Sequence, residues 1–139
     1  MLIKKFGNKY VIRIDKGEEI IETLKTFCKS NNIKLGSISG IGAANKIVLG
    51  LFETDTKKYL SQEFVGDFEI VPLAGNISTM KGETYLHLHA NIADIKHNSF
   101  GGHLTSAVVS ATFEVIIDTI DGEVDRKFSN EIGLNLLEL

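Results

Sequence analysis

The sequence of 139 residues has one cysteine, one proline and no apolar run approaching the roughly 20 residues that a membrane-spanning helix needs. The lone Cys28 cannot form an internal disulfide, and the N-terminus is charged rather than signal-like. These absences predict a soluble protein of the reducing cytoplasm, with no membrane role.

An excess of basic residues is also missing, because 15 Lys and Arg stand against 18 Asp and Glu, for a net charge of -3. Proteins that bind nucleic acid mainly through phosphates normally carry a basic excess or a basic stripe. The composition therefore argues against direct phosphate-driven binding of DNA.

The size and the 43% hydrophobic content suit a single domain over residues 1–139. A chain of this length buries roughly two-thirds of its unfolded surface, so it needs no disulfide or structural metal to fold.

The N-terminal part predicts a hairpin over residues 2–15, turning at Gly7-Asn8, and then one amphipathic helix. Asp15 and Glu18 have the spacing of a capping box at the helix start. We expect the helix to end at residues 30–32, where Asn tolerates a left-handed conformation. Its apolar positions follow at helical spacing: Ile20, Ile21, Leu24, Phe27 and Cys28.

From residue 33 onward the pattern is that of strands joined by hairpin turns, with no second helix. The predicted fold class is therefore α+β, with a mainly antiparallel β-sheet and one helix near the N-terminus. Pro72 predicts an edge, a strand start or a bulge. The expected strands cover residues 38–44, 46–53, 58–65, 68–78, 84–92 and 104–118.

The C-terminal run over residues 132–139 is rich in leucine and must be covered. It either docks on its own sheet or contributes to a subunit interface, because exposed apolar patches usually mark contacts.

Residues 85–92 carry the chemically most informative pattern. Apolar residues alternate with polar ones, so His87 and His89 share one face of a strand, with Cα atoms roughly 6.5 to 7 Å apart. His103 follows Gly101-Gly102 and could fold back beside them in an antiparallel pair.

Three histidines with an open fourth position are typical of a catalytic or ligand-binding zinc site. The alternative is that all three are ordinary strand residues, because His-x-His spacing alone is weak evidence. His97 lies in a polar loop and is a poorer candidate ligand.

Four segments in order resemble the plants-and-prokaryotes conserved (PPC) domain. They are residues 39–43 (SGIGA), 66–78 (GDFEIVPLAGNIS), 87–90 (HLHA) and 101–104 (GGHL). The resemblance implies a compact α+β domain that assembles as a homotrimer. It also implies a histidine cluster at His87, His89 and His103, similar to a metal site in some prokaryotic members.

The acidic residue of the family's Gly-x-Phe-Glu-Ile motif matches Glu69. It is interpreted either as a partner that orients an imidazole near the metal, or as an ordinary hydrogen-bonded strand residue.

Plant members carry the domain behind AT-hook motifs in DNA-binding proteins, and prokaryotic members often bear a DNA-binding label. This chain has no Arg-Gly-Arg-Pro hook and no basic tail.

Three hypotheses follow. The first is a homotrimer that binds zinc or another divalent metal at the three histidines, with room for a small ligand. This hypothesis leaves open whether the protein is an enzyme. The second is a DNA-associated regulator, and the third is a pure assembly module.

Overall fold

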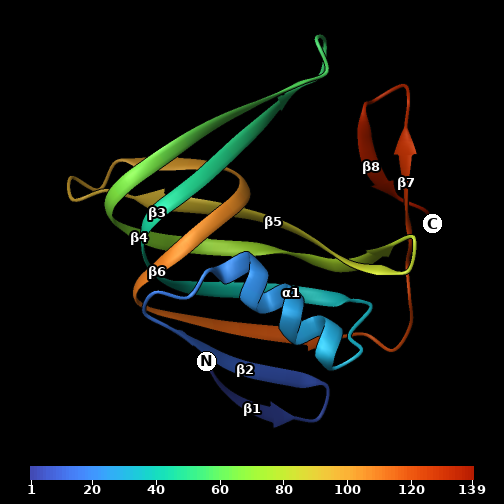
Figure 1. Ribbon diagram of the computed structural model, residues 1–139, viewed down its shortest axis with the longest axis horizontal. Coiled ribbons are helices and arrows are strands. Elements are labelled where there is room, and N and C mark those ends of the chain that lie inside the picture. The colour runs from blue at the N-terminus through green and yellow to red at the C-terminus, as the bar shows by residue number, and fades with distance from the viewer.

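The computed structural model describes residues 1–139 and confirms the α+β class, with one helix and mostly antiparallel strands. Figure 1 shows the arrangement. The elements are β1 (Leu2–Phe6), β2 (Lys9–Asp15), α1 (Ile20–Ser30), β3 (Gly36–Glu53), β4 (Lys58–Met80), β5 (Glu83–Ala93), β6 (Ser99–Thr119), β7 (Arg126–Ser129) and β8 (Leu134–Leu137).

The main sheet has six strands in the order β1-β2-β6-β3-β4-β5, and β5 also pairs with β6. That second pairing closes β3, β4, β5 and β6 into a ring of paired strands. The first residues of β6 pair with β5, whereas its later residues pair with β3 and β2. The chain thus forms a closed end beside a more open sheet, as the curling strands of Figure 1 show.

Two pairs of expected strands are each one continuous strand. Residues 38–44 and 46–53 lie within β3, and residues 58–65 and 68–78 lie within β4. One register shift replaces both expected breaks, because Ala44 pairs with Phe68 whereas Lys46 pairs with Val65. A bulge bends a strand without ending it. A second register shift, between Ile70 and Leu73 of β4, places Pro72 at a bulge, one of its three predicted places.

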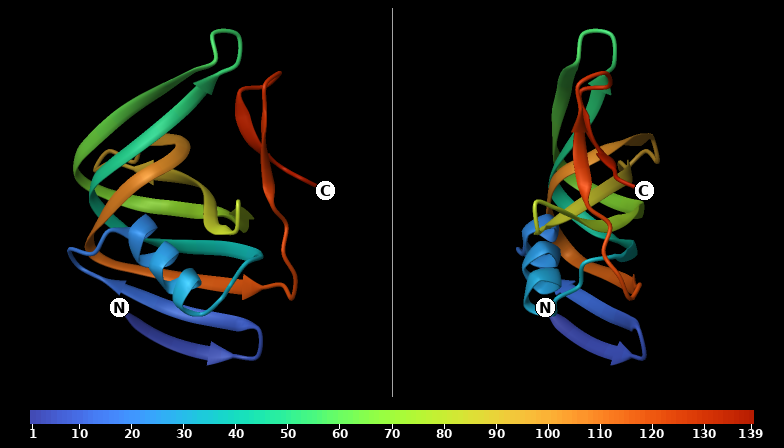
Figure 2. Two further views of the ribbon diagram at one scale, coloured as in Figure 1. Left: turned by 45° about the vertical axis from the view of Figure 1, so that its right-hand side comes forward. Right: turned by 90° about the vertical axis from the view of Figure 1, so that its right-hand side faces the viewer.

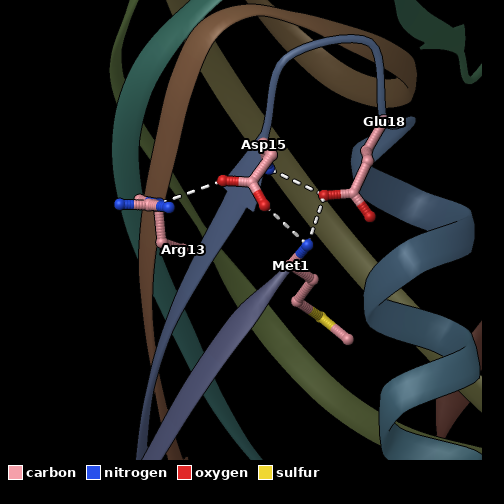
Figure 3. A network of polar contacts seen from close by, with 4 residues as sticks. All are labelled: Met1, Arg13, Asp15 and Glu18. Atoms are coloured by element: carbon pink, nitrogen blue, oxygen red, sulfur yellow. Dashed lines mark hydrogen bonds and ion pairs between the residues drawn. The ribbon is translucent and has the colours of Figure 1, made fainter.

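The helix begins later than the capping box predicts, at Ile20 with Glu19 as its N-cap. The backbone N–H of Asp15 donates to the Glu18 carboxylate at 2.7 Å, as in a capping box. The Asp15 carboxylate, however, accepts from Met1 and Arg13 rather than from the helix (Figure 3). The predicted end is confirmed, because the helix stops at Ser30 and Asn32 has a left-handed φ of 52°.

The core lies between α1 and one face of the sheet. Leu24, Phe27 and Cys28 of the helix are buried there, as are Ile12 and Phe113 of β2 and β6. Burial raises the pKa of the Cys28 thiol to about 12, so it packs as an inert apolar group.

The opposite face of the sheet has no helix over it, as Figure 2 shows. Directly paired residues share a face of an antiparallel sheet, so Val11, Ile116 and Ser39 form one row on this face. The row continues through Ala74 to His89, which places the histidine strand on the uncovered side.

The C-terminal leucines belong to a separate two-stranded hairpin, β7–β8, which stands beside the closed end of the sheet (Figure 2). The backbone N–H of Thr79 donates to Val124 at 3.0 Å, and Arg126 joins the hairpin to β4. The hairpin therefore docks on its own protomer, while Leu136 and Leu137 stay exposed.

Candidate metal centre

The structure brings His87, His89 and His103 together. β5 supplies the first two, and the pairing of His89 with His103 brings the third from β6. The ring centroids lie 5.2, 5.4 and 5.5 Å apart, so the three imidazoles form a compact triangle. The predicted fold-back of His103 is confirmed.

Two glycines allow this close approach. Gly50 pairs with His103 across β3 and β6, and a Cβ on Gly50 would lie 2.2 Å from the ring of Tyr59. The Tyr59 ring instead packs edge-on against His103, with centroids 5.7 Å apart. At Gly102, a Cβ would lie 2.7 Å from the carbonyl oxygen of Gly50, so only glycine lets β6 approach β3 so closely here.

The donor geometry fits a single transition metal ion. The ligand nitrogens of the three histidines all lie within 4.8 Å of one another, and the Nε2 atoms of His87 and His89 are 3.3 Å apart. Two nitrogens at about 2.0 to 2.1 Å from a tetrahedral zinc ion lie about 3.4 Å apart, which matches the closer pair.

The environment favours the neutral imidazole, which is the form that binds metals. Burial, followed by the neighbouring His87 and His89, lowers the pKa of His103 to about 4. Burial also lowers the pKa of His87, with smaller contributions from the Arg126 guanidinium and from His89.

The histidines lie at one side of a cavity of about 580 Å³ between the sheet and the C-terminal hairpin. Its polar lining includes Tyr59, Asn76, Tyr85 and Arg126, none of which the sequence pattern identified. These residues come from distant parts of the chain, so no local spacing could reveal them. Its apolar wall consists of Leu51, Phe52, Leu134, Leu136 and Leu137.

Glu69 lies elsewhere. It pairs with Ala93 on β5, whereas His89 pairs with Ala74, five residues further along β4. Glu69 and His97 line a separate depression, away from the three histidines. The structure therefore gives no support to Glu69 as the residue that orients an imidazole, and it leaves His97 outside the cluster as expected.

The sequence model of the Plants and Prokaryotes Conserved (PCC) domain matches residues 1–121, most of the chain. The chain belongs to this family. The match includes all three histidines and ends before β7, so Arg126 and the leucines of the C-terminal hairpin lie outside the matched residues of the PCC domain.

Two solved structures share this fold over nearly their whole length. A candidate DNA-binding protein of Bacteroides thetaiotaomicron is 36% identical, with a TM-score of 0.97 over 99% of this chain and 96% of that one. A metal-containing protein of Archaeoglobus fulgidus is 28% identical, with a TM-score of 0.90 over 100% and 99% of the two chains.

Similarity also extends to the bifunctional protein GlmU of Synechococcus, at 26% identity over 121 residues. The match covers 85% of this chain but spans only 18% of the length of that protein.

The PCC domain contains one helix, α1, of 11 residues, and it is too short to cross a membrane.

Proposed function

We propose that this protein is a homotrimer that binds a divalent metal, zinc, through His87, His89 and His103, and that the fourth metal position is open to water or a small ligand. The observation that carries the proposal is the convergence of three imidazoles from two strands, with all ligand nitrogens within 4.8 Å. The similarity to a metal-containing relative of 28% identity supports it.

Zinc bound by three histidines supplies Lewis acidity at its open position, which suits hydrolysis or hydration. The residues of the chain prepare that position. Burial keeps His87 and His103 neutral, as their lowered pKa values indicate. Tyr59 packs against the His103 ring and restricts it, and the hairpin leucines give one side of the cavity an apolar lining. We assign no substrate.

The uncovered face of the sheet supports the trimer. Val11 is 45% exposed and Ile116 is 47% exposed, although both lie in the middle of the sheet. Exposed apolar side chains in the middle of an uncovered sheet face suit a surface that another subunit covers.

The second candidate function is association with DNA, which the name of the Bacteroides relative suggests. The charge distribution of one protomer argues against it. Lys4 and Lys5 lie on β1, whereas Lys57 and Lys58 lie at the β3–β4 tip, at the opposite end of the molecule (Figure 1). Basic side chains so far apart form no continuous surface for phosphates.

Metal content decides between these functions. Mass spectrometry of tag-free protein, purified without added metal or chelator, is expected to find about one zinc or other transition ion per chain. The His87→Ala/His89→Ala variant is expected to lose the metal. His97→Ala removes a histidine outside the cluster and is expected to keep it.

Absence of metal both before and after incubation with zinc would refute the metal site. A titration of DNA against salt would then separate the other two hypotheses, because binding through phosphates weakens steeply as salt rises. An assembly module would show no DNA binding at any salt concentration.

A further inference from the structure

Arg126 is the most unusual charged residue of the cavity. It is 7% exposed, and no carboxylate lies within ion-pair distance of its guanidinium. Its hydrogen bonds go instead to neutral acceptors, at 2.8 Å each: Asn76 Oδ1, Ser78 Oγ and the carbonyl oxygen of Asn135. Its face stacks on Tyr85, with 4.7 Å to the ring centroid.

These bonds hold the side chain rigidly without neutralising it. A guanidinium has five N–H groups, and three have acceptors here, so two remain without an acceptor. A buried charge is costly unless it is paired, and an arginine that neutral groups fix in place is preorganised for an anion.

The cavity contains no counter-charge. Its lining includes Arg126 and the three histidines but neither aspartate nor glutamate. The net charge of the whole chain is -3, so this is a local feature rather than a general basic character. A divalent metal on the histidines would make the cavity still more positive.

We propose that this cavity binds a small organic carboxylate, whose carboxylate group pairs with Arg126 while its carbon skeleton lies against the apolar wall beside the three histidines. The contact with Arg126 is independent of a metal, and only a direct bond from the ligand to a metal rests on the proposed function.

The lining favours a carboxylate with a carbon skeleton over a simple inorganic anion. Leu137 pairs directly with Arg126 across the hairpin, and Phe52, Leu134 and Leu136 add to the apolar lining of the cavity. A cavity of about 580 Å³ has the size of ordinary small-molecule sites, which combine an apolar lining with a few fixed polar groups. The planar fork of arginine also matches the two oxygens of a carboxylate.

The site depends on the C-terminal hairpin. Arg126 is the first residue of β7, and Asn135 of β8 holds its Nη1 through a backbone carbonyl. Both lie beyond residues 1–121, the part that matches the family model. We therefore assign the choice of ligand to the hairpin and the metal to the sheet.

The test begins with zinc loading of the wild-type chain in a buffer without carboxylates, followed by measurement of its zinc content. Calorimetric titration then uses 4-methyl-2-oxopentanoate as the probe, its uncharged amide as the control ligand, and inorganic phosphate as the competing anion. We expect the carboxylate to bind at least tenfold more tightly than the amide and than phosphate.

Arg126→Gln is expected to weaken carboxylate binding at least tenfold while zinc content stays at the wild-type level. Lys127→Gln is the matched control, because Lys127 is the next residue of the same strand and is exposed. It is expected to bind within twofold of wild type. Arg126→Lys keeps the charge without the planar fork and is expected to give an intermediate affinity, which tests the proposal if the glutamine variant does not fold.

Failure of the metal site and failure of the carboxylate site give different results. A wild-type chain that takes up no zinc refutes the metal site, and the carboxylate is then titrated into metal-free protein, where binding must still depend on Arg126. No carboxylate binding in either form refutes the carboxylate site. Equal binding to wild type and folded Arg126 variants, or tighter binding of phosphate, also overturns it.

Discussion

The fold clearly alters the ionisation of His103. Its pKa falls to about 4 in the folded state, from an ordinary value near 6.5, because burial disfavours the charged ring. Between these two pH values the unfolded chain binds more protons than the folded chain, so the free energy of unfolding falls as pH falls.

We therefore expect the metal-free protein to lose stability as the pH drops from about 6.5 through about 4, and His103 to contribute nothing to the slope above that window. Urea unfolding at a series of pH values in the presence of a chelator measures this. The His103→Gln variant is expected to show a shallower pH dependence. An equal slope in both proteins would assign the pH effect to other groups.

The sequence identified the histidines because their signals are local. Alternation within one strand places His87 and His89 on one face, and the expected antiparallel pairing allows His103 to fold back beside them, although β6 begins at Ser99, before the expected strand at residue 104. The sequence pattern does not identify Arg126 or Tyr59, because only tertiary contacts bring them near the imidazoles. Arg126 arrives through the docking of β7 on β4, and Tyr59 through the pairing of β3 with β4. Glu69 was assigned from its motif, and strand register places it beside Ala93 instead.

At the scale of the elements, β6 decides whether the site exists, because it pairs with β5 and β3 at the same place. Gly102→Ala is expected to separate β6 from β3, since its Cβ would lie 2.7 Å from the Gly50 carbonyl. We expect a loss of about 1 to 3 kcal/mol in unfolding free energy and at least tenfold weaker zinc binding.

Gly101→Ala provides the control for that substitution. A Cβ there meets its nearest atom at 3.6 Å, which is an ordinary contact, so this variant is expected to retain zinc affinity within about threefold. Denaturant unfolding and competition with a zinc chelator measure both effects. If the two alanine variants behave alike, the close approach at Gly102 is not what positions His103.

The types of the elements can be predicted from the sequence, but some of their boundaries cannot. The hairpin, the helix and the antiparallel strands all follow from hydrophobic period and turn residues. That residues 38–44 and 46–53 form one strand cannot be predicted from the sequence, because a bulge and a loop both interrupt the alternation of apolar and polar residues. Only the pairing with neighbouring strands shows that the interruption is a bulge. The later start of the helix also depends on contact with another strand. The carboxylate of Glu19, the N-cap residue, accepts a hydrogen bond from the backbone N–H of Ala107 of β6 at 2.8 Å.

At the scale of the whole molecule, one face of the sheet is covered by α1 and the other is not. The uncovered face carries both the apolar row through Val11 and Ile116 and, at its far end, His89. A subunit that covers this row would therefore also approach the mouth of the cavity. The homotrimer and the candidate metal site are linked proposals for that reason.

Ile116→Asp tests the trimer directly. A carboxylate in the middle of the uncovered face would be buried without a partner on association, which costs several kcal/mol, whereas in the monomer it stays in water. We expect light scattering to give three times the chain mass of 15.3 kDa for the wild type and a lower mass for the variant.

Ile120→Asp is the control, because Ile120 is 57% exposed but lies just beyond the end of β6. It is expected to leave the mass unchanged. Zinc content measured on both variants then shows whether the site needs a neighbouring subunit. A dissociated but folded Ile116 variant that still binds one zinc per chain would make the three histidines of a single protomer sufficient, as their convergence from β5 and β6 of one chain predicts.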